Sequence, residues 1–97
     1  MIGRDEIISK LRETLPDIRR RFPVRRLALF GSSARGEATE TSDVDLLVEF
    51  DSPIGFFDFI RLEAALSEVL HAKVDLVSAK ALKPVIRDEV LNQAVYV

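Results

Sequence analysis

Residues 30–50, FGSSARGEATETSDVDLLVEF, decide the fold, because they place a turn of small residues shortly before two aspartates at positions i and i+2. The segment Val44–Phe50 is mainly β-branched, aliphatic or aromatic, which predicts a β-strand. Side chains two residues apart in a strand point to the same face, so we expect Asp43 and Asp45 to project side by side. The alternate residues then face the core: Val44, Leu46, Val48 and Phe50.

This aspartate pair predicts a cation site. Two carboxylates held so close repel each other, and one of them takes up a proton unless a cation neutralises the pair. Mg²⁺ is a hard divalent ion that prefers carboxylate and phosphate oxygens. Asp43 and Asp45 are therefore candidate magnesium ligands.

The preceding turn, GSSARG, has the composition of a phosphate cradle. Residues 26–30 predict a short apolar strand that runs directly into Gly31, where the backbone can approach a ligand closely. Ser32 or Ser33 can cap a short helix, whose first N–H groups attract anions. Arg35 adds a planar donor fork that suits phosphate. Either motif alone is also typical of an ordinary polar turn, but the two in this order favour a ligand site.

A third carboxylate follows further along the chain. The segment KVDLVS, residues 73–78, predicts an apolar strand in which Asp75 lies on the face opposite Val74 and Leu76. If this strand lies beside Val44–Phe50, three aspartates converge. The alternative is an acid at a strand edge that faces water.

Together, GSSARG, SDVDLLVEF and VDLVS resemble the minimal nucleotidyltransferases of the DNA polymerase beta superfamily. The similarity covers residues 27–97, and Gly-Ser followed by Asp-x-Asp is highly specific to that superfamily. It implies the fold class α/β (α+β), with a small mixed sheet flanked by helices as in the polymerase beta palm. A single nucleotidyltransferase domain over residues 1–97 is expected.

The resemblance also implies a role for each matching residue. Gly31 and Ser32 hold the β- and γ-phosphates of a nucleoside triphosphate, and Arg35 is a further phosphate contact. Two Mg²⁺ ions bind the paired aspartates, and the third aspartate shares one ion and helps to activate the acceptor. The implied catalytic and metal-binding residues are Asp43, Asp45 and Asp75. Two such ions clamp the attacking and leaving oxygens of an in-line displacement.

No residues remain for a second domain that grips the acceptor, so we expect a partner chain to supply it. The resemblance implies the antitoxin of a toxin–antitoxin pair, which transfers AMP from ATP to a tyrosine of its HEPN ribonuclease toxin. One alternative is a non-catalytic antitoxin that acts by binding, which three convergent acids disfavour. Another is an antibiotic-modifying nucleotidyltransferase, which the short chain disfavours because a small polar acceptor needs its own walls.

The remaining elements follow from apolar spacing and from prolines. Apolar residues recur at helical spacing in two places: Ile7, Ile8, Leu11, Leu15 and Ile18, and then Phe59, Leu62, Leu66 and Val69. Each set predicts an amphipathic helix. Pro16 is expected to kink or divide the first helix, and Pro84 fits the first turn of a third helix over residues 85–94. The predicted order is helix, strand, short helix, strand, helix, strand, helix.

Length and composition bound the class of protein. Ninety-seven residues with 47% hydrophobic content suit one domain with a modest core. The chain has no cysteine, which excludes a disulfide framework or a thiolate metal site. No apolar run approaches the ~20 residues that span a bilayer, and the charged first residues lack a secretory apolar region. We therefore expect a cytoplasmic protein with no membrane partner.

Charge gives weaker guidance. With 14 basic and 16 acidic residues the net charge is −2, which gives no general reason to expect nucleic-acid binding. The basic run of residues 19–26 is interpreted as a solvated helix end, with a surface for an acidic partner or nucleic acid as the alternative. His71 is likewise interpreted as a helix-end residue rather than a catalytic base.

Three apolar segments are candidates for a partner surface. Phe56 and Phe57 are interpreted as core residues at the start of a helix, with a partner contact as the alternative. Ile2, the first helix and residues 95–97 are candidate exposed patches.

Overall fold

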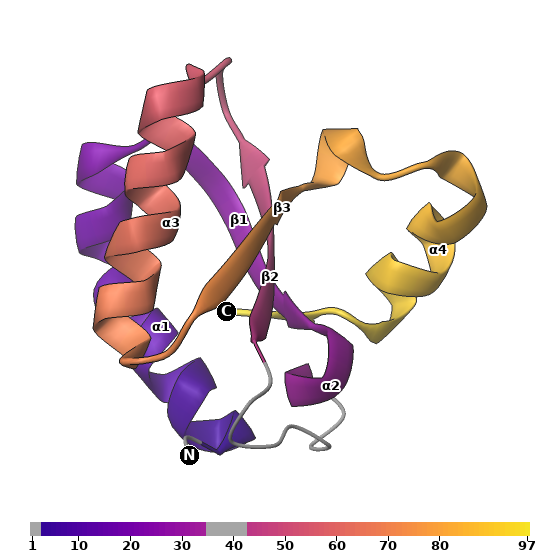
Figure 1. The fold of residues 1–97 in the computed structure, drawn as a ribbon, viewed down its shortest axis with the longest axis horizontal. Helices are drawn as coiled ribbons and strands as arrows, with labels where there is room; N and C mark the ends of the chain where they lie inside the picture. Colours follow the sequence, from indigo (N-terminus) through magenta and orange to yellow (C-terminus); the bar gives the residue numbers. More distant parts are fainter. Residues whose placement is uncertain (1–2, 35–42) are drawn as a thin grey trace.

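The computed structural model describes residues 3–34 and 43–97 (Figure 1). Its elements in chain order are α1 (Arg4–Arg21), β1 (Val24–Phe30), α2 (Gly31–Ala34), β2 (Val44–Phe50), α3 (Phe56–Leu70), β3 (Val74–Ser78), the 3-10 turn η1 (Ala79–Ala81), α4 (Pro84–Gln93) and β4 (Val95–Tyr96). The predicted order of helices and strands is confirmed. A further strand, β4, was not predicted.

The described strands form a four-stranded mixed sheet in the order β3-β2-β1-β4. β1 runs antiparallel to both β2 and β4, whereas β2 and β3 are parallel. Parallel neighbours need a crossover connection, and α3 supplies it. The sheet and its helices confirm the predicted α+β class.

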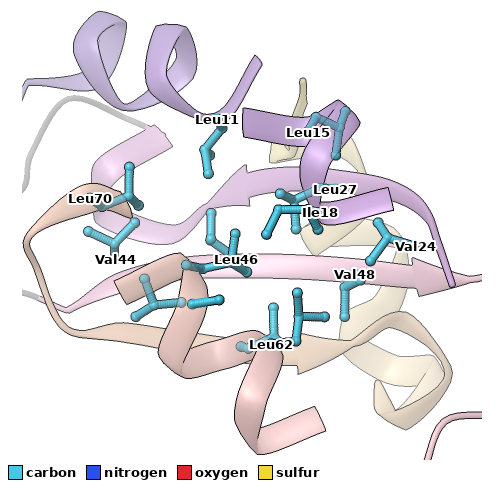
Figure 2. Close-up of a cluster of buried hydrophobic side chains, with 14 of the residues drawn as sticks. Leu11, Leu15, Ile18, Val24, Leu27, Val44, Leu46, Val48, Leu62 and Leu70 are labelled. Carbon is cyan, nitrogen blue, oxygen red and sulfur yellow. The ribbon is translucent and has the colours of Figure 1, made fainter. Parts of the chain in front are cut away.

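The main core lies between one face of the sheet and the helices α1 and α3, which lie side by side in Figure 1. Figure 2 shows apolar side chains from both helices and from β1 and β2 pointing toward one another in this layer. The face of β2 that was predicted to meet the core does so, because Val44, Leu46 and Val48 are at most 3% exposed. Burial along β2 does not alternate strictly, since Leu47 on the other face is 1% exposed. Burying each such side chain contributes about 1.5–3 kcal/mol. The opposite face carries Asp45 and Glu49, which are partly buried, together with Leu47 and Ala28, which are fully buried.

α1 runs unbroken through Pro16, so the proline does not divide the helix. A proline inside a helix removes one backbone hydrogen bond. Leu15 and Ile18, on the turns around it, are 6% and 1% exposed and anchor both turns on the core. Beyond the proline, Arg20 and Arg21 pair with Asp17 at 3.1 and 3.6 Å, which confirms that the basic run begins as a solvated helix end.

α3 departs from the sequence prediction at its first turn. Phe56 and Phe57 are 72% and 75% exposed, so the interpretation of this pair as core residues is wrong. The reason is that the buried face of α3 begins only at Leu62, and the first turn extends past the core. The prediction for His71 is confirmed, because it caps the C-terminus of α3 in the left-handed conformation, with φ of 50°.

The C-terminal residues 95–97 are not an exposed patch. Val95 and Tyr96 form β4 against β1, and the amide of Val97 donates a 3.0 Å hydrogen bond to the carbonyl of Leu27. Val95 and Val97 pack against the core cluster and are only partly exposed. Ile2 lies outside the described residues. None of the described helices combines the length and the apolar character needed to cross a bilayer.

Candidate active site

The turn after β1 lies directly against one of the predicted metal ligands. Gly31 follows β1 with a φ of +72°, a conformation that glycine adopts without steric cost. A Cβ atom placed on Gly31 would collide with the carboxylate oxygen Oδ2 of Asp45, and it would lie 3.1 Å from the Cγ of that residue. Cross-strand pairing explains this contact, because Phe30, the residue before the glycine, is the register partner of Asp45. The turn and the carboxylate are therefore in direct contact.

Asp75 is brought next to Asp45 by the parallel pairing of β2 and β3. β3 lies beside β2, as the convergence of the aspartates requires, and Asp75 is the register partner of Asp45. Neighbouring strands lie about 4.8 Å apart, so register partners project from the same face side by side. Asp75 is exposed and Asp45 is partly buried. Two acids thus stand next to each other at the start of two adjacent strands.

Asp43 lies just before β2 and forms an ion pair with a lysine. The Nζ atom of Lys73 lies 3.8 Å from Oδ2 of Asp43, and the two side chains are 81% and 43% exposed. An exposed ion pair of this length contributes at most ~1 kcal/mol. Among the residues that the structure describes, no group of three or more His, Cys, Asp or Glu side chains is placed to hold a metal ion. The strands bring the three acids to one end of the sheet, but their side chains do not converge there.

The chemical type of the candidate ligands nevertheless suits magnesium. Carboxylate oxygens are the ligands that Mg²⁺ prefers, and the ion is usually held by only one or two of them. Without a cation, neighbouring carboxylates repel each other. The Lys73 ammonium, 3.8 Å from Asp43, would compete with such an ion for this carboxylate.

Of two other predicted residues, one is described only in its backbone and the other is not described. Ser32 belongs to α2, but its side chain lies outside the described part of the structure, and Arg35 lies outside the described residues altogether. The end of α2 is fixed from a distance, because Nε of Arg4 donates a 3.0 Å hydrogen bond to the carbonyl of Ala34. The first turn of α1 thereby holds the turn that begins at Gly31, a role that no sequence pattern indicated.

Two polar residues of α3 fix β3 and thus position Asp75. The amide of Val74 donates to Oγ of Ser67 at 3.1 Å, and the amide of Leu76 donates to Oε2 of Glu63 at 2.9 Å. These bonds flank Asp75 on both sides and satisfy two N–H groups that point away from β2. Sequence reasoning missed this pair, although a carboxylate and a hydroxyl four residues apart on a helix face were a usable signal.

Arg26 on β1 contacts side chains of both neighbouring strands, β2 and β4. Its Nη2 lies 2.8 Å from Oε2 of Glu49 on β2, and its guanidinium lies 4.6 Å from the ring centroid of Tyr96 on β4. The close polar contact with the Glu49 carboxylate raises the pKa of Arg26 above its ordinary value. The contact is an ion pair rather than a well-directed hydrogen bond, since Oε2 of Glu49 lacks a hydrogen-bond partner among the described residues. The contact between Arg26 and the Tyr96 ring adds to the pairing of β4 with β1.

A family comparison agrees with this geometry. The family model described as nucleotidyltransferase domain matches residues 11–97. The chain belongs to this family and is a nucleotidyltransferase.

Individual relatives narrow the class to small members of the family. Protein adenylyltransferase MntA of Thermococcus cleftensis is 44% identical over 97 residues, which cover 100% of this chain and 98% of the relative. A solved structure named as a candidate minimal nucleotidyltransferase has a TM-score of 0.84 at 37% identity, covering 97% of this chain and 95% of that one. A chain in a crystal structure of a toxin–antitoxin complex with AMP-PNP has a TM-score of 0.69 at 25% identity, covering 98% of this chain and 72% of that one. The resemblance to minimal nucleotidyltransferases is confirmed.

Proposed function

We propose that this chain transfers AMP from ATP to a hydroxyl of a partner protein, a tyrosine of a HEPN-type toxin, and so acts as the antitoxin of that toxin. The contact between Gly31 and the carboxylate of Asp45 carries the proposal, because it joins a close-approach turn to a candidate metal ligand. Two relatives support it. One is named a protein adenylyltransferase, and the other is a toxin–antitoxin complex with a nucleotide analogue.

In the proposed reaction the acceptor oxygen attacks the α-phosphorus, the bond between the α-phosphorus and the bridging oxygen breaks, and pyrophosphate leaves. Gly31 leaves room for the triphosphate to lie against the backbone of the turn. Asp43, Asp45 and Asp75 would hold Mg²⁺, which when bound neutralises phosphate charge and lowers the pKa of a coordinated hydroxyl. Asp75, which is exposed, faces the acceptor and helps to remove its proton.

Neutralisation of the toxin by binding alone is the second candidate. The observation that favours it is the ion pair between Lys73 and Asp43, which occupies one of the proposed metal ligands. ATP binding and AMP transfer would then be dispensable for the antitoxin effect.

Labelled ATP separates the two candidates. The chain is incubated with Mg²⁺, with a HEPN-type toxin protein, and with ATP labelled on either the α- or the γ-phosphate. Transfer predicts that the α-label, and not the γ-label, appears on the HEPN protein, and that EDTA abolishes it. The Asp45→Asn variant should lose the label while remaining folded, whereas Asp51→Asn, which changes an exposed acid after β2, should keep it.

Two other outcomes would contradict the proposal. The binding candidate would be favoured if the chain forms a stable complex that neutralises the toxin without labelling it, and if Asp45→Asn neutralises the toxin as well as the wild type does. Label retained in Asp45→Asn would instead refute the role of that carboxylate.

A further inference from the structure

A cavity of about 600 Å³ opens at the far end of β2 from the candidate active site. Residues of β1, β2, α3, η1 and α4 line it. Glu49 lines the cavity and follows Asp45 by four positions, so it projects from the same face of β2 about 13 Å away at roughly 3.3 Å per residue. The volume lies in the range of about 300–1,000 Å³ that is typical of ligand sites. The active-site residues themselves do not line this cavity.

One side of the cavity is aromatic. Phe50, Phe56 and Phe59 line it, and the rings of Phe50 and Phe59 meet edge to face at 6.3 Å between centroids. Phe57 and Ile60, next to the cavity on α3, are 75% and 45% exposed. A contiguous exposed apolar patch of this kind marks an interaction site.

The other side of the cavity is cationic. Arg25, Lys80 and Arg87 line it, and Glu49 is the one acid among the lining residues. None of these three cations forms an ion pair within the part of the chain that the structure describes. The Glu49 carboxylate is already engaged by Arg26 at 2.8 Å. The cavity is therefore positively charged in a chain whose net charge is −2.

α4, which contributes Arg87, has little support of its own. All ten of its residues are described and none is buried, and Val85 and Ile86 are 85% and 44% exposed. Figure 1 shows it standing apart from the sheet on the side opposite α1 and α3, and it contacts α2, the turn that starts at Gly31. Helices this short are marginal without packing partners. A protein seated on α4 would bury these apolar side chains.

We propose that the cavity and the exposed face of α4 form the docking surface for the acceptor protein, and that they bind an acidic segment of it that carries an aromatic or aliphatic side chain. The inference rests on the proposed function, since it names where the acceptor is held. Charge complementarity selects an acidic occupant. A second copy of this chain fits poorly, because a two-fold contact through the cavity would bring the same cations face to face. A segment anchored here spans the distance to Asp45 with about four extended residues.

Steady-state transfer and direct binding test the proposal together. Lys80→Glu/Arg87→Glu reverses two exposed cations, Phe56→Ser removes an exposed ring, and Arg12→Glu is the matched control on an exposed position of α1. We expect both cavity variants to raise the KM for the HEPN protein at least tenfold. The kcat at saturating acceptor and the KM for ATP should stay within twofold, and the control should match the wild type.

Binding without chemistry supplies an independent readout. The Kd for the same HEPN protein, measured without ATP and Mg²⁺, should rise in parallel with its KM. A glutamate–tyrosine copolymer should compete for wild-type binding, whereas a lysine–tyrosine copolymer of the same length should not.

Each remaining outcome decides one question. Unchanged KM and Kd in both cavity variants, with AMP transfer intact, would overturn the docking surface and leave the proposed function standing. A raised Kd with no transfer by any form of the protein would support the docking surface and refute the proposed function. Loss of self-association in the cavity variants, with unchanged acceptor binding, would reassign the surface to a second copy and overturn the proposal.

Discussion

Replacing Gly31 by alanine should destabilise the fold and the active site through two separable effects. An L-residue with a side chain at φ of +72° loses about 1–2 kcal/mol relative to glycine. The new Cβ atom also meets the Asp45 carboxylate, which must leave its rotamer at a cost of about 0.5–1.5 kcal/mol. The stiffer unfolded chain offsets about 0.5 kcal/mol of this. We expect Gly31→Ala to lower the free energy of unfolding by about 1–3 kcal/mol.

A double-mutant cycle with Asp45→Ala isolates the second effect. Removing the carboxylate leaves the backbone strain and the 3.3 Å approach to the Cβ atom of residue 45, so urea unfolding of the four proteins should give a coupling of about 0.5–1.5 kcal/mol. Gly55→Ala is the control, because a Cβ atom there meets no neighbour within 4 Å. That control should lie within about 0.5 kcal/mol of the wild type, because lost cap preference and lower unfolded-state entropy oppose each other.

The same substitution should also damage catalysis. Displacing the Asp45 carboxylate or the turn by about 1 Å should reduce kcat/KM for AMP transfer on the order of 100-fold. Strictly additive stabilities in the cycle, within about 0.3 kcal/mol, would refute the reasoning that Gly31 and Asp45 share one space. Wild-type transfer by Gly31→Ala would refute the role of the turn in the site.

Two further predictions concern residues that position the carboxylates. Glu63→Ala should lower the free energy of unfolding by about 1–3 kcal/mol, because the amide of Leu76 loses its acceptor. Glu63→Gln keeps an acceptor oxygen, and a loss in urea melts equal to that of the alanine variant would contradict this account. Lys73→Met should change stability by less than about 1 kcal/mol, because it removes an exposed ion pair. It should also lower the Mg²⁺ concentration that half-saturates transfer, since Asp43 is released, and an unchanged magnesium titration would argue against competition between the lysine and the metal.

Local pattern was enough to predict β1, β2 and β3. The alternation of Val44, Leu46 and Val48 encodes both the strand and its buried face, since the period of a strand is two residues. The register between paired strands could not be predicted from the sequence. The contact between Gly31 and Asp45 depends on how β1 pairs with β2, and one sequence does not specify that pairing. The position of Asp75 beside Asp45 was likewise conditional on a strand order that only the structure supplies.

Other differences have equally specific causes. β4 covers only Val95 and Tyr96, which is too short to show any period. Phe56 and Phe57 have the apolar character of core residues, but hydrophobicity alone does not distinguish a side chain buried within the chain from one exposed for a partner. The hydrogen bonds from β3 to α3 join side chains to backbone across 7 and 13 positions, beyond the reach of local pattern.

Those same bonds to α3 also affect how the protein behaves at high concentration. A strand at the rim of a sheet offers unpaired amides as a template on which further chains can polymerise. In β3 the amides of Val74 and Leu76 are already saturated by Ser67 and Glu63. Fewer amides of this rim are thereby left for a further strand, while the opposite rim, β4, is only two residues long. The side chains that align Asp75 should thus also make edge-to-edge pairing through β3 less favourable.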